Sequence, residues 1–93
     1  MKVSKDILEA YNGQYSDAMT YARSLGGKYK AQNIKDLAKN IEFNNVLEVG
    51  CGEGSVLQWL SDWNFSKDLN GIEISESAAE MARKRKMKNV KSI

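Results

Sequence analysis

The sequence is short of the residue types that mark disulfides, metal sites and membrane spans. It contains no histidine and no proline, and Cys51 is its one cysteine. A single cysteine cannot form a disulfide within the chain, which fits a reducing compartment, and no spacing typical of a metal site occurs. No apolar run approaches the ~20 residues that span a bilayer, and the N-terminal residues lack the pattern of an export signal. We therefore expect a cytoplasmic protein that needs no metal and binds no membrane.

The composition is that of an ordinary globular domain. Of the 93 residues, 42% are hydrophobic and 28% are charged, which argues against a disordered or fibrous chain. A chain of this length supports one small hydrophobic core. Positions 83–93 hold basic residues and no acid. Such a run can bind nucleic acid, but cations also favour the C-terminal end of a helix, so we expect a solvated helix end and no nucleic-acid partner.

The region before residue 46 is expected to be helical. Ser4 and Ser16 are suited to cap helices over residues 5–12 and 17–25, and the second of these should stop at Gly26. Apolar residues recur at the spacing of one helical face between about residues 30 and 41, which predicts a third helix. Residues 1–45 are therefore expected to form a helical region in front of residues 46–93, and the interpretation of this region as a lid or cap rests on the family resemblance given below.

From residue 46 onward, the apolar pattern alternates between strand and helix periods. The expected order is strand, helix, strand, helix, strand, with bounds of about 46–49, 55–63, 69 to 73 or 74, 76–87 and 90–93. This alternation predicts an α/β fold, in which right-handed crossovers build a parallel sheet with helices on its faces. Only the start of a third strand is present, and a parallel sheet this small should be exposed where its neighbouring strands are missing. The family resemblance given below implies that the first strand keeps one bare edge, so we expect the chain alone to be unstable or to associate.

The strongest motif runs from Glu48 to Gly54, where an acidic residue at the end of the first strand precedes three glycines at alternate positions. Glycine allows a tight turn and brings bare backbone against a ligand. An ordinary turn between strand and helix is the simpler interpretation of the glycines alone. A dinucleotide-binding fold would place its third glycine at position 55, where this sequence has Ser55, and the spacing therefore disfavours a pyrophosphate ligand.

With Glu48 included, this segment resembles the first motif of class I S-adenosylmethionine-dependent methyltransferases. The resemblance covers residues 46–93 and implies a Rossmann-like, three-layer α/β/α fold, here truncated after the start of the third strand. It implies that Glu48 holds the amino group of S-adenosyl-L-methionine, usually through water, which agrees with the need of an ammonium group for a carboxylate. The glycine loop would lie against the methionyl part of the cofactor through Gly50, Cys51, Gly52 and Gly54.

A second acid, Glu73, ends the second strand in the sequence GIEIS. In the family that Glu48 to Gly54 resembles, an acid there binds both ribose hydroxyls, a task for which the two carboxylate oxygens are suited. Ile74 then occupies a position that lines the adenine pocket in the family. Tyr15 and Tyr21 lie where small-molecule members of the family place a helical lid. A surface glutamate, a core isoleucine and plain aromatic packing are the simpler alternatives.

The resemblance implies methyl transfer to a small-molecule acceptor, but it identifies no catalytic residue in this sequence. Cys51 at a helix start could be imagined as a nucleophile, yet no histidine is present to activate it, and a small loop residue is the better interpretation. We expect the sequence to be the cofactor-binding N-terminal part of a methyltransferase, inactive alone. The alternatives are a short non-catalytic relative that binds cofactor or a partner, with self-association through the bare sheet edge, and half of a nucleotide-binding oxidoreductase.

Overall fold

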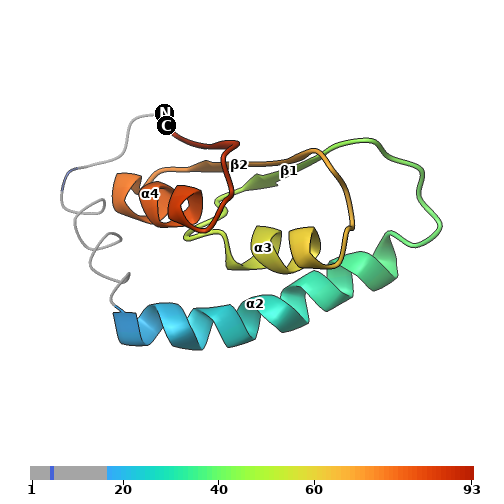
Figure 1. Ribbon diagram of the computed structural model, residues 1–93, viewed down its shortest axis with the longest axis horizontal. Coiled ribbons are helices and arrows are strands. Elements are labelled where there is room, and N and C mark those ends of the chain that lie inside the picture. The colour runs from blue at the N-terminus through green and yellow to red at the C-terminus, as the bar shows by residue number, and fades with distance from the viewer. Residues whose placement is uncertain (1–4, 6–16) are drawn as a thin grey trace.

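The computed structural model describes residue 5 and residues 17–93, with side chains at residue 5 and from residue 25 onward. Its elements are arranged as a small parallel sheet with helices packed against it (Figure 1). In chain order they are α2 (Asp17–Leu37), β1 (Val46–Val49), α3 (Ser55–Asp62), β2 (Leu69–Glu73), α4 (Glu76–Lys84) and β3 (Val90–Ser92). The predicted alternation of strands and helices is confirmed from residue 46 onward.

The sheet has the order β1-β2-β3, and both pairs of neighbouring strands are parallel. Val46 pairs with Leu69 and Gly71 pairs with Val90, so the carboxyl ends of the strands lie at one edge of the sheet. β2 is the central strand, while β1 forms an edge, as the sequence predicted. These features confirm the Rossmann-like α/β class.

One face of the sheet carries the core of the described residues. Leu57 of α3 and Ala79 and Ala82 of α4 pack together with Val90 of β3 in one hydrophobic cluster, so both crossover helices cover the same face. On the opposite face of β1, Leu47 and Val49 are 60% and 73% exposed. Residues 17–93 thus supply the sheet and one helical layer of the predicted three-layer arrangement.

α2 packs along α3, which lies between α2 and the strands (Figure 1). Its buried Ala31 joins Val56 and Leu60 of α3 in a second cluster, and Trp59 and Trp63 pack against that cluster. Because Leu57 already faces the sheet, the neighbouring face of α3 with both tryptophans is left to bind α2. The buried Val56, Leu57 and Leu60 of α3 recur at helical spacing, as expected for an amphipathic helix.

The prediction of two helices separated at Gly26 is wrong, because α2 continues through Gly26 and Gly27 to Leu37. A Cβ atom added to Gly27 would lie 2.6 Å from the Oγ atom of Ser55. Glycine at this position therefore lets α2 approach the start of α3 closely, and the packing outweighs the low helix propensity of glycine. The helix also ends at Leu37, earlier than the predicted residue 41, and the helix predicted over 5–12 lies almost entirely outside the described residues.

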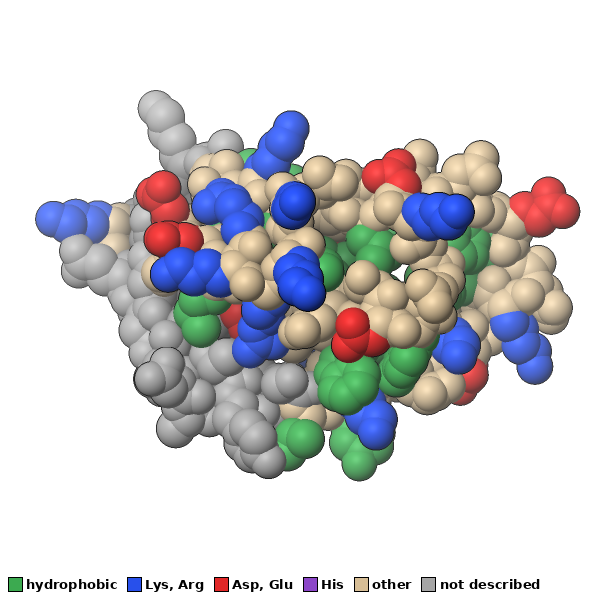
Figure 2. Space-filling view, in the orientation of Figure 1, with side chains coloured by type: hydrophobic (Ala, Val, Ile, Leu, Met, Phe, Trp, Pro, Cys, Tyr) green, Lys and Arg blue, Asp and Glu red, His purple; other side chains and the backbone are tan. Residues whose placement is uncertain are grey.

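The basic segment follows the end of α4. Arg83 and Lys84 lie in the last turn of this helix, and Figure 2 shows Lys and Arg side chains gathered over it. Arg83 donates a hydrogen bond to the carbonyl oxygen of Val90, and Arg85 donates one to Gln58. This end of the helix therefore carries the cations that its dipole favours. None of the helices described here has the length and apolar character required to cross a membrane.

Replacing each of the two neighbouring glycines of α2 with alanine should change the stability of the chain in opposite directions. No atom lies within 4 Å of a Cβ added to Gly26, so Gly26→Ala should stabilise the chain by about 0.5–1 kcal/mol through helix propensity. Gly27→Ala should destabilise it by about 1–3 kcal/mol, because Ser55 must move. Urea denaturation of both variants measures this difference, and equal shifts would contradict the close packing of α2 on α3.

Candidate functional site

The loop from β1 to α3 runs through three glycines with left-handed backbone. The φ angles of Gly50, Gly52 and Gly54 are 72°, 58° and 81°, which residues with a Cβ atom rarely adopt. The N–H groups of Gly50 and Cys51 both donate to the carbonyl oxygen of Ile72, at 2.8 and 3.1 Å. The loop therefore turns tightly at the end of β1 while remaining attached to β2.

Glu73 holds this loop from the end of β2. Its side chain is 1% exposed, and its Oε1 atom accepts a hydrogen bond from the N–H of Gly52 at 2.8 Å. Its Oε2 atom accepts one from the N–H of Ser75 at 2.8 Å. The hydroxyl oxygen of Ser75 in turn accepts the N–H of Ala78, which caps α4 as predicted. One buried carboxylate thus joins the ends of two strands and the start of a helix.

A cleft of about 380 Å³ separates the glycine loop from α2. The glycine loop, the end of β1 and the start of α3 form one wall, and one turn of α2 forms the other. The lining residues are Gly26, Gly27, Lys30, Glu48, Gly50, Cys51, Gly52, Glu53, Ser55 and Val56. The cleft lies at the carboxyl end of β1, where open parallel sheets bind their ligands.

The cleft is lined by more acidic than basic side chains. Glu48 and Glu53 line it with one basic side chain, Lys30. The Oε1 atoms of both glutamates are buried and accept no hydrogen bond from the described part of the chain, and Glu53 is only 3% exposed. Buried oxygens without a donor are costly, so both positions favour a ligand that donates hydrogen bonds or carries positive charge.

Burial also changes the acidity of two groups at the cleft. Desolvation raises the pKa of Glu48 to about 7; the charge of Lys30 opposes this rise, and Glu53 and Glu73 add to it. Desolvation, together with the charges of Glu48 and Glu73, raises the pKa of the Cys51 thiol to about 12. Cys51 is therefore a protonated thiol at neutral pH, which removes the basis for a nucleophilic role.

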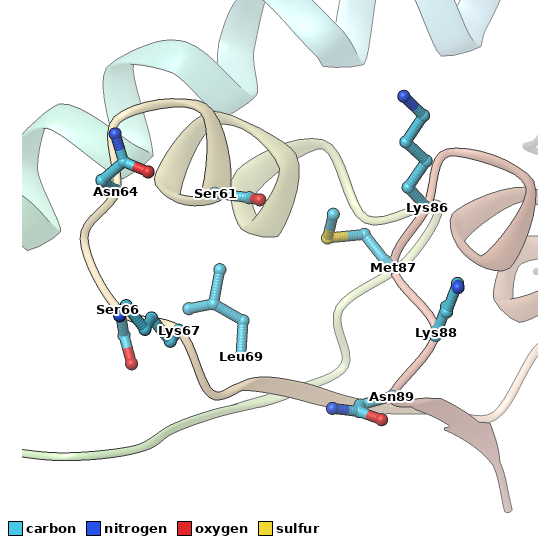
Figure 3. A pocket seen from close by; sticks show the side chains of 9 residues that line it. All are labelled: Ser61, Asn64, Ser66, Lys67, Leu69, Lys86, Met87, Lys88 and Asn89. Carbon is cyan, nitrogen blue, oxygen red and sulfur yellow. The ribbon is translucent and has the colours of Figure 1, made fainter.

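A second cavity, of about 470 Å³, opens at the opposite, amino end of the strands (Figure 3). Leu69 and Met87 point into it, whereas Lys86 extends away from it. It is the larger of the two spaces, but no acidic side chain and no residue of the glycine loop lines it. Because ligand sites of parallel α/β folds form at the carboxyl ends of strands, we assign the site to the cleft beside Glu48.

A family model described as a methyltransferase domain matches residues 21–92. The chain belongs to this methyltransferase family. The matched range begins within α2 and extends through β3, so it includes both walls of the cleft. The match favours the methyltransferase interpretation over the oxidoreductase alternative. A comparison of the chain with curated proteins found no match.

The structure brings together the first group of predicted cofactor-binding residues of this methyltransferase domain. Glu48, Gly50, Cys51 and Gly52 all line the cleft. The side chain of Cys51 packs into the hydrophobic core, so its contribution to the cleft surface is mainly backbone. These residues lie beside one another because the glycines fold the loop back over the end of β1.

Other predicted site residues do not line the cleft. Gly54 faces α4 instead, where an added Cβ would lie 2.9 Å from the Cβ of Ala82. Glu73 is enclosed beneath the loop, and Ile74 is half-buried beyond the end of β2. Tyr15 lies outside the described residues, and Tyr21 lies in α2 with a side chain that the structure does not describe. Their cofactor roles stay predictions.

The sequence motif alone did not reveal Lys30 and Glu53 as cleft residues. Glu53 lies between two glycines at a position for which the motif specifies no residue type, and its burial depends on the fold of the loop. Lys30 follows Gly27 by nearly one helical turn, so both face the cleft only because α2 is continuous. Because the sequence predicted that the helix would stop at Gly26, Gly27 and Lys30 were not expected to lie on the same side of one helix. Among the described residues, no group of three side chains is suited to hold a metal ion.

Glu73→Ala should strongly destabilise the methyltransferase domain. It removes the buried acceptor of the Gly52 and Ser75 N–H groups and leaves both donors unsatisfied, at a cost of about 2–4 kcal/mol. Glu80→Ala is the matched control, because Glu80 forms only an exposed ion pair with Lys84. Urea denaturation should separate the two variants, and equal midpoints would contradict the role of Glu73 in holding the loop.

The raised pKa of Glu48 predicts that stability falls as pH rises. The folded chain binds a proton at Glu48 more tightly than the unfolded chain, so stability is lost between the ordinary carboxyl pKa and about 7. Glu48→Gln should be more stable than the natural chain at pH 8.5 by about 1 kcal/mol. This value is smaller than the full pKa shift would give, because water partly screens the half-buried carboxyl group. At pH 4.5 the difference should nearly vanish. Thermal melting at both pH values tests this, and a pH-independent difference would contradict it.

Proposed function

We propose that the chain binds S-adenosyl-L-methionine in the cleft between α2 and the glycine loop. The observation that carries the proposal is the pairing of an open glycine backbone with two buried carboxylate oxygens that lack donors. The methyltransferase family match supports the same cofactor. In this proposal residues 46–93 supply the cofactor-binding half of the domain, and α2 in the preceding region closes the cleft from the other side.

The glycine loop fits the methionyl end of this cofactor. A Cβ atom on Gly50 would have no neighbour within 4 Å, so the glycine leaves open space at the cleft where a ligand can approach the backbone. Glu48 stands beside this space with a buried, unpartnered Oε1 atom. An ammonium group there would supply the missing hydrogen bond and stabilise the ionised form of Glu48.

The adenosine end would extend toward the carboxyl end of β2. The family resemblance assigns the ribose hydroxyls to Glu73 and the adenine ring to the neighbourhood of Ile74. Glu73 already accepts two backbone N–H groups, so ribose hydroxyls must reach a carboxylate that is only 1% exposed in this structure. We propose that this carboxylate both holds the loop and binds ribose.

The bound cofactor supplies a methyl group already activated on a sulfonium, and the protein contributes position and exclusion of water. On this chain, Glu48 and the glycine loop fix the amino-acid end of the cofactor. We assign no side chain of the chain to proton transfer. A small molecule is proposed as the methyl acceptor, with Tyr15 and Tyr21 in the region that would cover it.

A non-catalytic relative that self-associates is the second candidate function. The exposed Leu47 and Val49 side chains lie on β1, the edge strand of the sheet among the described residues. Edge strands with apolar side chains pair readily with other chains. This candidate shares the cofactor site with the first and differs from it in lacking methyl transfer.

Calorimetric titration of S-adenosylhomocysteine into the chain tests the cofactor site. The natural chain should bind saturably, and Gly50→Ala should bind at least tenfold more weakly, because its methyl group and backbone strain act at the cleft. Asn64→Ala is the matched control. Asn64 also has a left-handed backbone, with φ 55°, so alanine adds similar backbone strain there, but this residue lines the cavity beside Leu69 and Met87. This control variant should bind normally. No saturable binding by a chain that is folded by circular dichroism would contradict the proposal.

A further inference from the structure

We infer that Lys30 binds the α-carboxylate of the cofactor, so that the amino-acid end lies between Lys30 and Glu48. The inference rests on the proposed function and adds a residue from α2 to it. An amino acid carries an ammonium and a carboxylate on the same carbon atom. A site that binds the ammonium through Glu48 therefore also brings a carboxylate close to an acidic surface.

The fold fixes Lys30 at the cleft. Gly27 packs against Ser55 at the start of α3, which leaves no room for even a methyl group between the two helices. Lys30 follows on the same side of α2 and lines the cleft together with Glu48 and Gly50. The close contact of Gly27 with Ser55 thus places this part of α2 against the start of α3, and Lys30 follows about one helical turn later.

Lys30 is the one basic residue in the lining of the cleft. It lies near enough to Glu48 for its charge to oppose the rise in the pKa of that carboxyl group. It nevertheless forms no ion pair with any side chain of residues 25–93, since the ion pair found there joins Lys84 to Glu80. Its ammonium group is therefore not committed to a partner within that part of the chain.

The glycine loop offers few backbone donors to a carboxylate. The N–H groups of Gly50 and Cys51 donate to Ile72, and that of Gly52 donates to Glu73. The N–H of Gly54 donates to the carbonyl oxygen of Cys51. The start of α3, at Ser55 and Val56, also lines the cleft. A ligand carboxylate near Glu48 gains most from a cationic side chain, because hydrogen bonds from a charged donor are the stronger ones.

The charge balance of the cleft supports the same arrangement. Glu48 and Glu53 contribute two carboxylates and Lys30 one ammonium. A ligand with a sulfonium, an ammonium and a carboxylate has one net positive charge, which neutralises a cleft in which both glutamates are ionised. Without Lys30, the ligand carboxylate would face the two glutamates directly, and like charges at close range are repulsive.

Two ligands that differ only by the carboxylate test this role. S-Adenosylhomocysteine and its decarboxylated analogue are titrated into the natural chain and into Lys30→Met. The variant should bind S-adenosylhomocysteine about tenfold more weakly and the decarboxylated analogue with unchanged or higher affinity. Lys30→Arg should restore most of the loss. Lys28→Met is the matched control, because Lys28 lies over the Trp59 ring and does not line the cleft; it should change neither affinity.

The outcomes separate this inference from the proposed function. Tight binding of S-adenosylhomocysteine by Lys30→Met would overturn the inference and leave the cofactor site intact. An equal loss for both ligands would also overturn it, since the lysine would then act through packing of α2. If the folded natural chain bound neither ligand, the proposed function and the inference would both be wrong.

Discussion

The loop between β1 and α3 keeps its left-handed glycines in place because the carboxylate of Glu73 accepts N–H groups from both Gly52 and Ser75. Those two bonds connect the loop after β1 with the turn after β2. They are buried, and the two oxygens of one carboxyl group accept them, so breaking either bond would leave a buried N–H group unsatisfied. The open surface of Gly50 and the position of Glu48 both depend on this loop conformation. The candidate site is thus a consequence of one buried acid.

The wall of the cleft that α2 forms depends on a contact between two small residues. Gly27 and Ser55 let α2 and α3 approach closely, and this brings Lys30 to the same cleft as Glu48. Acidic side chains therefore line one wall and a basic side chain lines the other, on either side of a space of about 380 Å³. A ligand with both an ammonium and a carboxylate complements such a pair of walls. The structure explains in this way why a helix outside the glycine motif belongs to the site.

Local sequence signals were sufficient to predict the strands of the sheet and the helices that connect them. The apolar runs at 46–49 and 69–73, the glycine loop and the cap at Ser75 each depend on neighbouring residues, and the structure places all of them as expected. The continuity of α2 could not be predicted in the same way. Gly26 and Gly27 weaken a helix locally, and the compensating contact with Ser55 lies far along the sequence.

The same distinction applies to the site residues. Glu48 and Gly50 follow from the spacing of the motif, whereas Lys30 reaches the cleft only through the packing of α2 on α3. Gly54 belongs to the motif as well, yet the structure assigns it to contact with Ala82. A spacing pattern identifies where the backbone must turn, but it does not distinguish a glycine that faces a ligand from one that faces a helix.

The central claim is that the cofactor binds between α2 and the glycine loop. Amide chemical shifts of the isotope-labelled chain, recorded by NMR spectroscopy during addition of S-adenosylhomocysteine, test it most directly. We expect the largest changes at residues 26–30 and 50–56, with little change around the cavity lined by Leu69 and Met87. Large changes confined to that second cavity, or none at α2, would contradict it.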